Sequence, residues 1–188
     1  MAFKDTILTF EGDKIVTNDG REVMMSWEAP IMEKSAEYIC DSKGDILEIG
    51  FGMGICSDYI QAQGVNSHTI IEIHPQVIEK LKIWASDKSN VIVIEGDWSS
   101  VDGLGTCDGI FIDTYEDENW SKFKEFSINV SNSGARITYW NAEYENENQH
   151  NYDNLTHEMV DKGSTEFYSY APFDKYCMPR WCYNGYCL

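Results

Sequence analysis

The sequence predicts a doubly wound α/β fold, a Rossmann-like architecture around a mostly parallel sheet of seven strands. Short, fully apolar segments alternate along the chain with longer segments in which apolar residues recur every three to four positions. The former are typical of parallel strands buried on both faces, and the latter of helices that cover a sheet. Because 188 residues with 43% hydrophobic content suffice for one such core, we expect residues 1–188 to form a single domain. It divides into an N-terminal segment at 1–22 and the Rossmann-like core at 23–188.

The N-terminal segment has the pattern of a hairpin. Its apolar runs at 7–10 and 14–17 are followed by the turn-forming clusters EGD and NDG. Clusters of this composition join short strands. A helix is predicted from Pro30, since proline suits the first helical position and the apolar residues that follow share one face.

The remaining elements alternate between strand and helix. Strands are predicted at 46–50, 68–73, 91–96, 109–113, 135–140, 165–170 and 176–183. Helices are predicted at 54–63, 75–86, about 118–130 and about 151–161. His74 precedes Pro75 and is interpreted as the cap of a helix rather than as a base. Since ligands of such sheets bind beyond the carboxyl ends of the strands, the residues that follow each strand are the candidate site residues.

Composition narrows the classes of partner. The formal net charge is -18, from 14 Lys and Arg against 32 Asp and Glu. Such a chain repels a phosphate backbone, so no nucleic-acid partner is expected. No stretch approaches the roughly 20 apolar residues of a membrane span, and no secretory signal is visible, so we expect a cytoplasmic protein without a membrane partner. Cys177, Cys182 and Cys187 match no zinc spacing, so no metal is expected. The sequence leaves the oligomeric state open.

A glycine-rich turn follows the strand at 46–50. The stretch LEIGFGMGIC has the pattern E-x-G-x-G-x-G, which differs from the G-x-G-x-x-G of dinucleotide-binding folds. Glycine permits positive φ angles and lets the backbone approach a ligand closely. The candidate cofactor residues in this turn are Glu48, Gly50, Phe51, Gly52, Met53 and Gly54.

The next two strands also end in residues suited to a nucleoside. IIEIHP places Glu72, followed by Ile73, where a carboxylate can accept both hydroxyls of a ribose. EGDW places Asp97 after Gly96, where its carboxylate could accept a hydrogen bond from an adenine amino group. Trp98 offers a stacking face.

Together, the glycine turn and the two acidic strand ends resemble the nucleoside-binding motifs of class I S-adenosylmethionine-dependent methyltransferases. A dehydrogenase is the other adenosine-binding enzyme to consider. The register of the glycines and the lack of a second nucleotide-binding half favour the methyl donor.

A further carboxylate, Asp113, lies at the exit of the strand in GIFIDTYEDENW, which in this fold lies beside the glycine-rich strand and faces the donor's methyl group. A guanidinium group can accept a methyl group only after it has lost a proton. Nearby carboxylates can both bind the cation and accept that proton. Glu28, in VMMSWEAPIM, is a second candidate. Its alternative interpretation is a charge that favours the start of the helix at Pro30.

The order of VMMSWEAPIM, ILEIGFGMGI, IIEIHPQVIEKLKIWA, EGDW and DGIFIDTY resembles the guanidinoacetate methyltransferase group, which also includes the fungal protein-arginine N-delta-methyltransferases. The resemblance runs from about Val23 to Tyr139. It implies that Glu28 and Asp113 bind the guanidino group, with Asp113 as the proton acceptor. It also implies that Glu72 binds the ribose and that Trp98 lies beside the adenine. Further residues expected near the donor or substrate are Met25, Trp27, Thr114, Tyr115, Trp140 and Asn141.

The expected function is therefore an enzyme that transfers a methyl group from S-adenosylmethionine to a guanidino nitrogen, with S-adenosylhomocysteine as product. Guanidinoacetate or a similar small guanidino compound is the first substrate hypothesis. One alternative is a protein-arginine N-methyltransferase, whose partner would be an arginine side chain of a protein. The alternative of another class is an S-adenosylmethionine-binding interaction module without catalysis.

Overall fold

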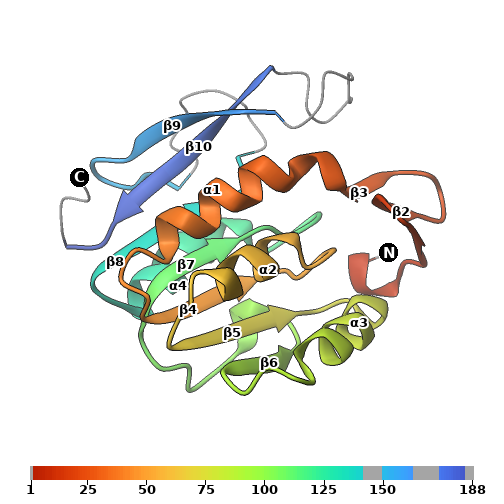
Figure 1. Ribbon diagram of the computed structural model, residues 1–188, viewed down its shortest axis with the longest axis horizontal. Coiled ribbons are helices and arrows are strands. Elements are labelled where there is room, and N and C mark those ends of the chain that lie inside the picture. The colour runs from red at the N-terminus through yellow and green to blue at the C-terminus, as the bar shows by residue number, and fades with distance from the viewer. Residues whose placement is uncertain (1, 142–149, 163–173, 185–188) are drawn as a thin grey trace.

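The computed structural model describes residues 2–141, 150–162 and 174–184. Within these ranges the chain forms a seven-stranded sheet and, at the N-terminus, a separate three-stranded sheet (Figure 1). The strand order of the large sheet is β6-β5-β4-β7-β8-β10-β9. Its strands are β4 (Asp45–Ile49), β5 (Ser67–Glu72), β6 (Val91–Glu95), β7 (Cys107–Ile112), β8 (Ser131–Tyr139), β9 (Thr156–Asp161) and β10 (Lys175–Cys182).

The sheet is mostly parallel. The five strands from β6 to β8 pair in parallel, and β10 pairs antiparallel with both of its neighbours. The predicted doubly wound, mostly parallel sheet is therefore confirmed. The helices are α1 (Ala29–Ile39), α2 (Ile55–Ala62), α3 (Pro75–Ala85) and α4 (Phe123–Asn129), with short 3-10 turns at Phe3–Asp5, Ser26–Glu28, Trp98–Ser100 and Trp120–Lys122.

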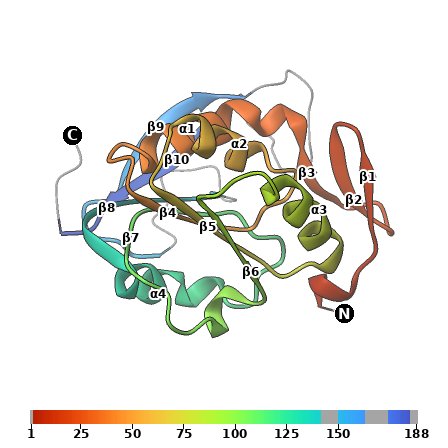
Figure 2. The same cartoon turned by 60° about the horizontal axis from the view of Figure 1, so that its bottom comes forward.

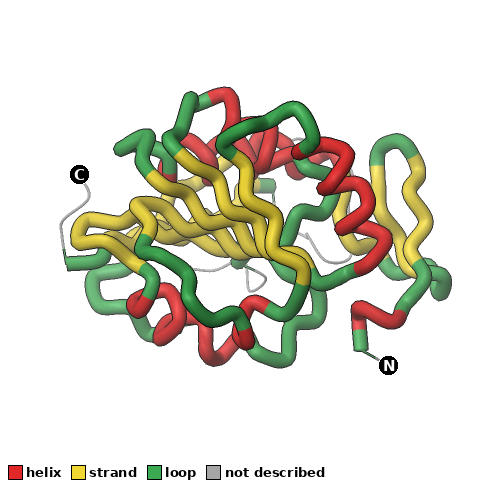
Figure 3. The backbone as a smooth tube through the Cα atoms, turned by 90° about the horizontal axis from the view of Figure 1, so that it is seen from below, coloured by secondary structure: helices red, strands yellow, loops and turns green. Residues whose placement is uncertain are grey.

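Helices cover both faces of the sheet (Figures 2 and 3). Helices α1, α2 and α3 pack on one face and α4 packs on the other. Strand β4 contributes to both cores, because successive side chains of a strand point to opposite faces. Its Ile46 joins the α1–α3 core, whereas Leu47 and Ile49 join the core on the α4 face. None of the helices in the described ranges is both long and apolar enough to cross a membrane.

One predicted helix is wrong. Residues 151–161 contain strand β9 instead, which pairs along its whole length with β10. The ion pairs Asp161–Lys175 and Glu158–Arg180 join the two strands. Pairing with a distant strand overrides local helix propensity here, and Asn154 has a positive φ of 60° that no helix accommodates. The strand predicted at 165–170 lies outside the described residues.

The predicted N-terminal hairpin is confirmed and is extended by a third strand. Strands β1 (Leu8–Glu11), β2 (Lys14–Thr17) and β3 (Glu22–Met25) form an antiparallel sheet that runs past residue 22. The side chain of Gln76, in the first turn of α3, holds both backbone groups of Leu8. His74 caps α3 as predicted, because its Nδ1 accepts the N–H of Gln76. The N-terminal sheet is thus fixed beside the carboxyl end of β5.

Candidate active site

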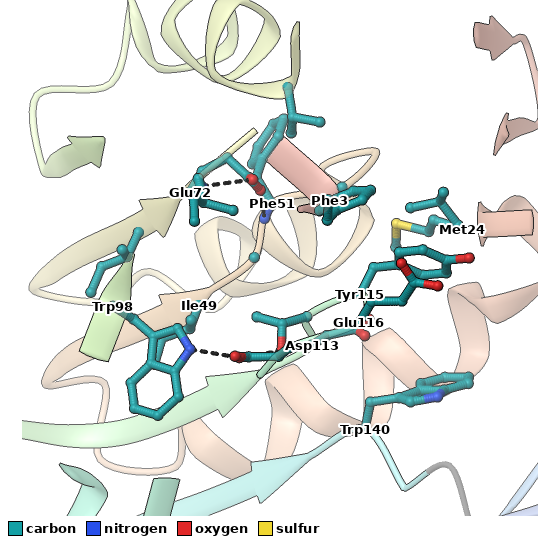
Figure 4. Close-up of a pocket in the computed structure, with 18 of the residues that line it drawn as sticks. Phe3, Met24, Ile49, Phe51, Glu72, Trp98, Asp113, Tyr115, Glu116 and Trp140 are labelled. Carbon is teal, nitrogen blue, oxygen red and sulfur yellow. Dashed lines mark hydrogen bonds between the residues drawn. The ribbon is translucent and has the colours of Figure 1, made fainter. Parts of the chain in front are cut away.

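A cavity of about 470 Å³ lies where the carboxyl ends of β4, β5, β6 and β7 face the N-terminal sheet (Figure 4). Its volume is typical of a site for a small molecule or cofactor. The structure brings most of the predicted site residues to this cavity. Those that line it are Glu28, Glu48, Gly50, Phe51, Gly52, Glu72, Ile73, Gly96, Asp97, Trp98, Asp113, Thr114, Tyr115 and Trp140.

Five predicted residues do not line the cavity: Met25, Trp27, Met53, Gly54 and Asn141. Met25 is buried elsewhere, and its neighbour Met24 faces the cavity, since the direction of side chains reverses at each residue of a strand. The amides of Asn141 are engaged in the sheet, where its N–H donates to the hydroxyl of Tyr176 and its Nδ2 to the carbonyl of Cys177. Asn141 therefore positions β10 rather than the cavity wall.

The glycine turn allows two strand ends to approach each other closely. Gly50 has a φ of +90°, and a Cβ at this position would lie 2.0 Å from the carbonyl oxygen of Asp113. Gly52 has a φ of +53°, and its Cβ would lie 2.4 Å from Sδ of Met24. A side chain at position 50 would be strained and would collide with the backbone of Asp113, and one at position 52 would be strained and would displace the side chain of Met24. The turn therefore leaves backbone, rather than side chains, facing the cavity.

Glu72 is a buried carboxylate held entirely by backbone groups. Its Oε2 accepts the N–H of Phe51 (Figure 4), and its Oε1 accepts the N–H groups of Ile73 and His74, all at 2.8 Å. Burial raises the pKa of Glu72, and the three backbone hydrogen bonds act in the opposite direction. The carboxylate is thus fixed between the glycine turn and the end of β5, facing the cavity.

The end of β6 contributes Asp97 and Trp98. One oxygen of Asp97 accepts the N–H of Ser99 and the other accepts Nδ2 of Asn119, which leaves lone pairs toward the cavity. Trp98 is 4% exposed and its indole N–H donates to Asp117 (2.7 Å). Its ring packs edge-on against Phe126 at 4.9 Å. Trp98 is therefore a core residue that also forms part of the cavity wall.

Asp113 has no side-chain hydrogen bond to any residue that the structure describes. Burial, reinforced by the charges of Glu48 and Glu72, raises its pKa to about 7. Glu28, the last residue of the 3-10 turn before α1, lines the same cavity, is 3% exposed, and accepts the N–H of Met25 at 2.8 Å. Two carboxylates thus reach the cavity, one from the turn before α1 and one from the residue after β7, and the pKa of Asp113 is suited to proton transfer at neutral pH.

Part of the cavity wall is formed by residues that the sequence patterns did not indicate. The ring of Phe3 lies between His74 and Tyr115, with ring centroids at 5.0 and 5.1 Å. Arg21 forms an ion pair with Glu116 and lies over the ring of Tyr115. Further lining residues missed by the sequence analysis include Met24, Met32, Cys56, Asp117, Glu118 and Asn119. Phe3 lies in a single 3-10 turn, an element too short to have a recognisable periodicity.

The raised pKa of Asp113 predicts an unusual dependence of stability on pH. The unfolded chain releases this proton near the ordinary pKa of 3.8, whereas the folded chain retains it up to about pH 7. The folded state is therefore progressively destabilised as pH rises from about 4 to 7. We expect Asp113→Asn to raise the free energy of unfolding by about 1–3 kcal/mol at pH 8 and by little at pH 4. Urea unfolding at the two pH values measures this, and an equal effect at both would contradict it.

The chain is similar to known proteins in sequence and in fold. The family model described as guanidinoacetate N-methyltransferase matches residues 2–176. The chain is 38% identical over 132 residues to protein arginine N-methyltransferase 2 of Aspergillus oryzae, covering 66% of this chain and 32% of that protein. It is 36% identical over 126 residues to the protein of the same name in Saccharomyces cerevisiae, covering 60% and 30%. The chain thus spans about a third of the length of these relatives.

Solved structures share the fold at low sequence identity. Spermidine synthase from Thermotoga maritima has a TM-score of 0.68 at 11% identity, covering 95% of this chain and 72% of that one. The N-methyltransferase NodS from Bradyrhizobium japonicum, in complex with S-adenosyl-L-homocysteine, has a TM-score of 0.65 at 14% identity, covering 85% and 88%. At these identities the likeness concerns the fold alone.

Proposed function

The chain belongs to the guanidinoacetate N-methyltransferase family, and from this premise we propose that it transfers a methyl group from S-adenosylmethionine to a guanidino nitrogen. The observation that carries the proposal is that Glu28 and Asp113 line the same cavity as the glycine turn and Glu72. A pair of carboxylates suited to a guanidinium and a carboxylate suited to a ribose thus share one space.

The donor end of the cavity fits S-adenosylmethionine in its polar groups. Glu72 has its oxygens fixed by three backbone N–H groups, and the lone pairs left over can accept ribose hydroxyls. The positive φ angles of Gly50 and Gly52 leave the backbone of the turn, without side chains, at the donor end of the cavity. Asp97 and the indole wall of Trp98 would hold the adenine end. When bound, the donor supplies an electrophilic methyl group.

The chain's own task in this reaction is to bind a guanidinium and take one proton from it. Glu28 and Asp113 would hold the cation by charge-assisted hydrogen bonds. A free guanidinium has no lone pair to offer, so the nitrogen becomes a nucleophile as its proton passes to an oxygen of Asp113. A base with a pKa near 7 is effective at neutral pH, which agrees with the raised pKa of Asp113.

The charge of the cavity favours a cationic acceptor. Among the described lining residues nine are acidic, and Lys4 is the one basic residue. An arginine side chain in a polypeptide brings a cation without a nearby carboxylate, whereas guanidinoacetate would need Lys4 to balance its carboxylate. The relatives named protein arginine N-methyltransferase 2 support an arginine side chain as the acceptor. We therefore propose a protein arginine as a candidate acceptor beside a small guanidino acid.

The experiment that tests the function combines binding and transfer. Calorimetry with S-adenosylmethionine and S-adenosylhomocysteine measures donor binding. Transfer of a labelled methyl group is then followed with guanidinoacetate, free arginine and an arginine-containing peptide. We expect donor binding and label on one of the guanidines, which also separates the two acceptors. Donor binding without transfer to any of these guanidines would instead favour a non-catalytic module.

Glu72→Gln is expected to weaken donor binding about 10- to 100-fold, because an amide replaces a charged acceptor that faces the ribose position. The matched control is Glu95→Gln. Glu95 is the register partner of Glu72 on β6, but it is exposed and pairs with Lys82. Calorimetric titration of both variants measures the difference. Equal donor affinities in the two variants would remove Glu72 from the proposed donor site.

A further inference from the structure

Glu48 is a buried carboxylate whose two oxygens differ in their hydrogen-bond partners. It lies in β4 and is 1% exposed. Its Oε2 accepts the hydroxyl of Ser57 at 2.5 Å and lies 2.9 Å from Nε2 of His68. Its Oε1 is buried and has no hydrogen-bond partner in the part of the chain that the structure describes. A buried acceptor left without a partner is costly, so this arrangement calls for a functional reason.

His68 holds Glu48 as an anion. The ring of His68 is fully buried, and its Nδ1 lies 3.2 Å from the amide Nε2 of Gln61. Because an amide nitrogen can only donate, Nδ1 accepts and the ring proton resides on Nε2, which donates to Glu48; this tautomer follows from the hydrogen-bond network. Two donors therefore meet on Oε2 of Glu48 and fix its orientation, and the charge of Glu48 acts on Asp113. The unit therefore carries one negative charge beneath the glycine turn.

The topology of the sheet places the carboxylate of Glu48 on the same face as the side chain of Asp113. Glu48 is the register partner of Phe111 on the adjacent strand β7. Asp113 follows Phe111 by two residues, so the two side chains point to the same face as Glu48. The N–H of Asp113 donates to the carbonyl of Ile49, which fixes the exit of β7 to that of β4. Glu48 and Asp113 both line the cavity.

On the premise of the methyl transfer proposed above, we propose that Glu48 is a positioning residue that acts through Asp113. Held by His68 and Ser57, it is a fixed buried anion that makes Asp113 a stronger base for the guanidino proton. The unpartnered Oε1 leaves part of that charge uncompensated in the interior of the protein. The role concerns proton transfer, since Oε1 is too deeply buried to contact a ligand.

The other groups around Asp113 do not replace Glu48. Glu72 approaches from β5, but both of its oxygens are compensated by backbone N–H groups. Glu28 lines the same cavity and is expected to pair with the acceptor. The charge of Asp113 also acts on Cys56 from α2 and on Tyr176 from β10, and burial raises the pKa of each well above its ordinary value, so both are neutral at physiological pH. Among these neighbours of Asp113, Glu48 is thus the carboxylate with a buried oxygen that no described donor contacts.

Glu48→Gln tests the inference, because it removes the charge and keeps the shape. In protein without donor, the carboxyl carbon of Asp113 is followed by NMR across pH, with Asp113→Asn to assign its signal. We expect its titration to move about one pH unit lower in Glu48→Gln. In the transfer assay, the acid limb of kcat/KM should move in the same direction. Above this limb, at about pH 8 to 9 where Asp113 is ionised in both proteins, kcat should fall about three- to tenfold with the KM for the donor little changed.

Substitutions of His68 provide the matched pair. Glutamine can place an N–H donor near the position of Nε2, so His68→Gln is expected to retain the wild-type titration of Asp113. Leucine has no N–H donor in its side chain, so His68→Leu should lower the pH at which Asp113 titrates, as Glu48→Gln does. An unchanged titration in both Glu48→Gln and His68→Leu would overturn the inference. The proposed function fails on a different result, namely wild-type protein that methylates no guanidine.

Discussion

Asp113→Asn is expected to reduce kcat for methyl transfer by about 10²- to 10⁴-fold while donor binding stays within about tenfold of wild type. Asparagine has the shape of aspartate but cannot accept the proton that a guanidinium must lose. The donor site should persist, because its polar groups come from the glycine turn and Glu72 rather than from this carboxylate. Labelled-methyl transfer under saturating donor and calorimetric titration measure the two quantities in one preparation.

A control on the same strand separates this effect from a general change of charge. Asp108 lies at the opposite end of β7, where its carboxylate accepts the N–H of Asp45 and Nδ2 of Asn132. Asp108→Asn alters the charge of β7 to the same extent but lies away from the cavity, so transfer should remain close to wild type. If Asp113→Asn retained a tenth or more of the wild-type rate, Asp113 would not be the base and Glu28 would become the candidate.

The location of the site followed from sequence because buried parallel strands have a strong local signature. Each of β4 to β7 is short and apolar and ends in a glycine or carboxylate, and the rule for open α/β sheets brings such ends together. Gly50, Glu72, Asp97 and Asp113 are therefore expected to meet, and all four line one cavity. The family resemblance also predicts Glu28 there, although Glu28 at the same time accepts the N–H of Met25 at the end of β3.

The remaining features depend on contacts that local patterns do not encode. The predicted Met25 and the observed Met24 differ by one position, which on a strand reverses the direction of the side chain. Strand β9 exists because β10 is available to pair with it. The partners of Glu48 come from α2 and β5, so the sequence could place Glu48 before the glycine turn but could not reveal its unpartnered oxygen.

Gly50→Ala is expected to be among the most disruptive single substitutions in the cavity. The new Cβ would lie 2.0 Å from the backbone oxygen of Asp113, and the φ of +90° is unfavourable for alanine. The backbone cannot relax easily, because the N–H of Gly50 donates to Ile71 and the N–H of Asp113 donates to Ile49. We expect a loss of about 2–4 kcal/mol in the free energy of unfolding, together with weaker donor binding.

Gly64→Ala is the control that separates strain from collision. Gly64 also has a positive φ, +71°, but a Cβ there would meet nothing within 4 Å. It should therefore lose only about 1 kcal/mol, the cost of the backbone conformation, and bind donor as wild type does. Urea unfolding and calorimetry on the two variants measure the difference. Equal losses would mean that backbone conformation alone makes glycine necessary at position 50; a larger loss in Gly50→Ala, accompanied by weaker donor binding, would mean that the close approach of β4 to β7 shapes the donor site.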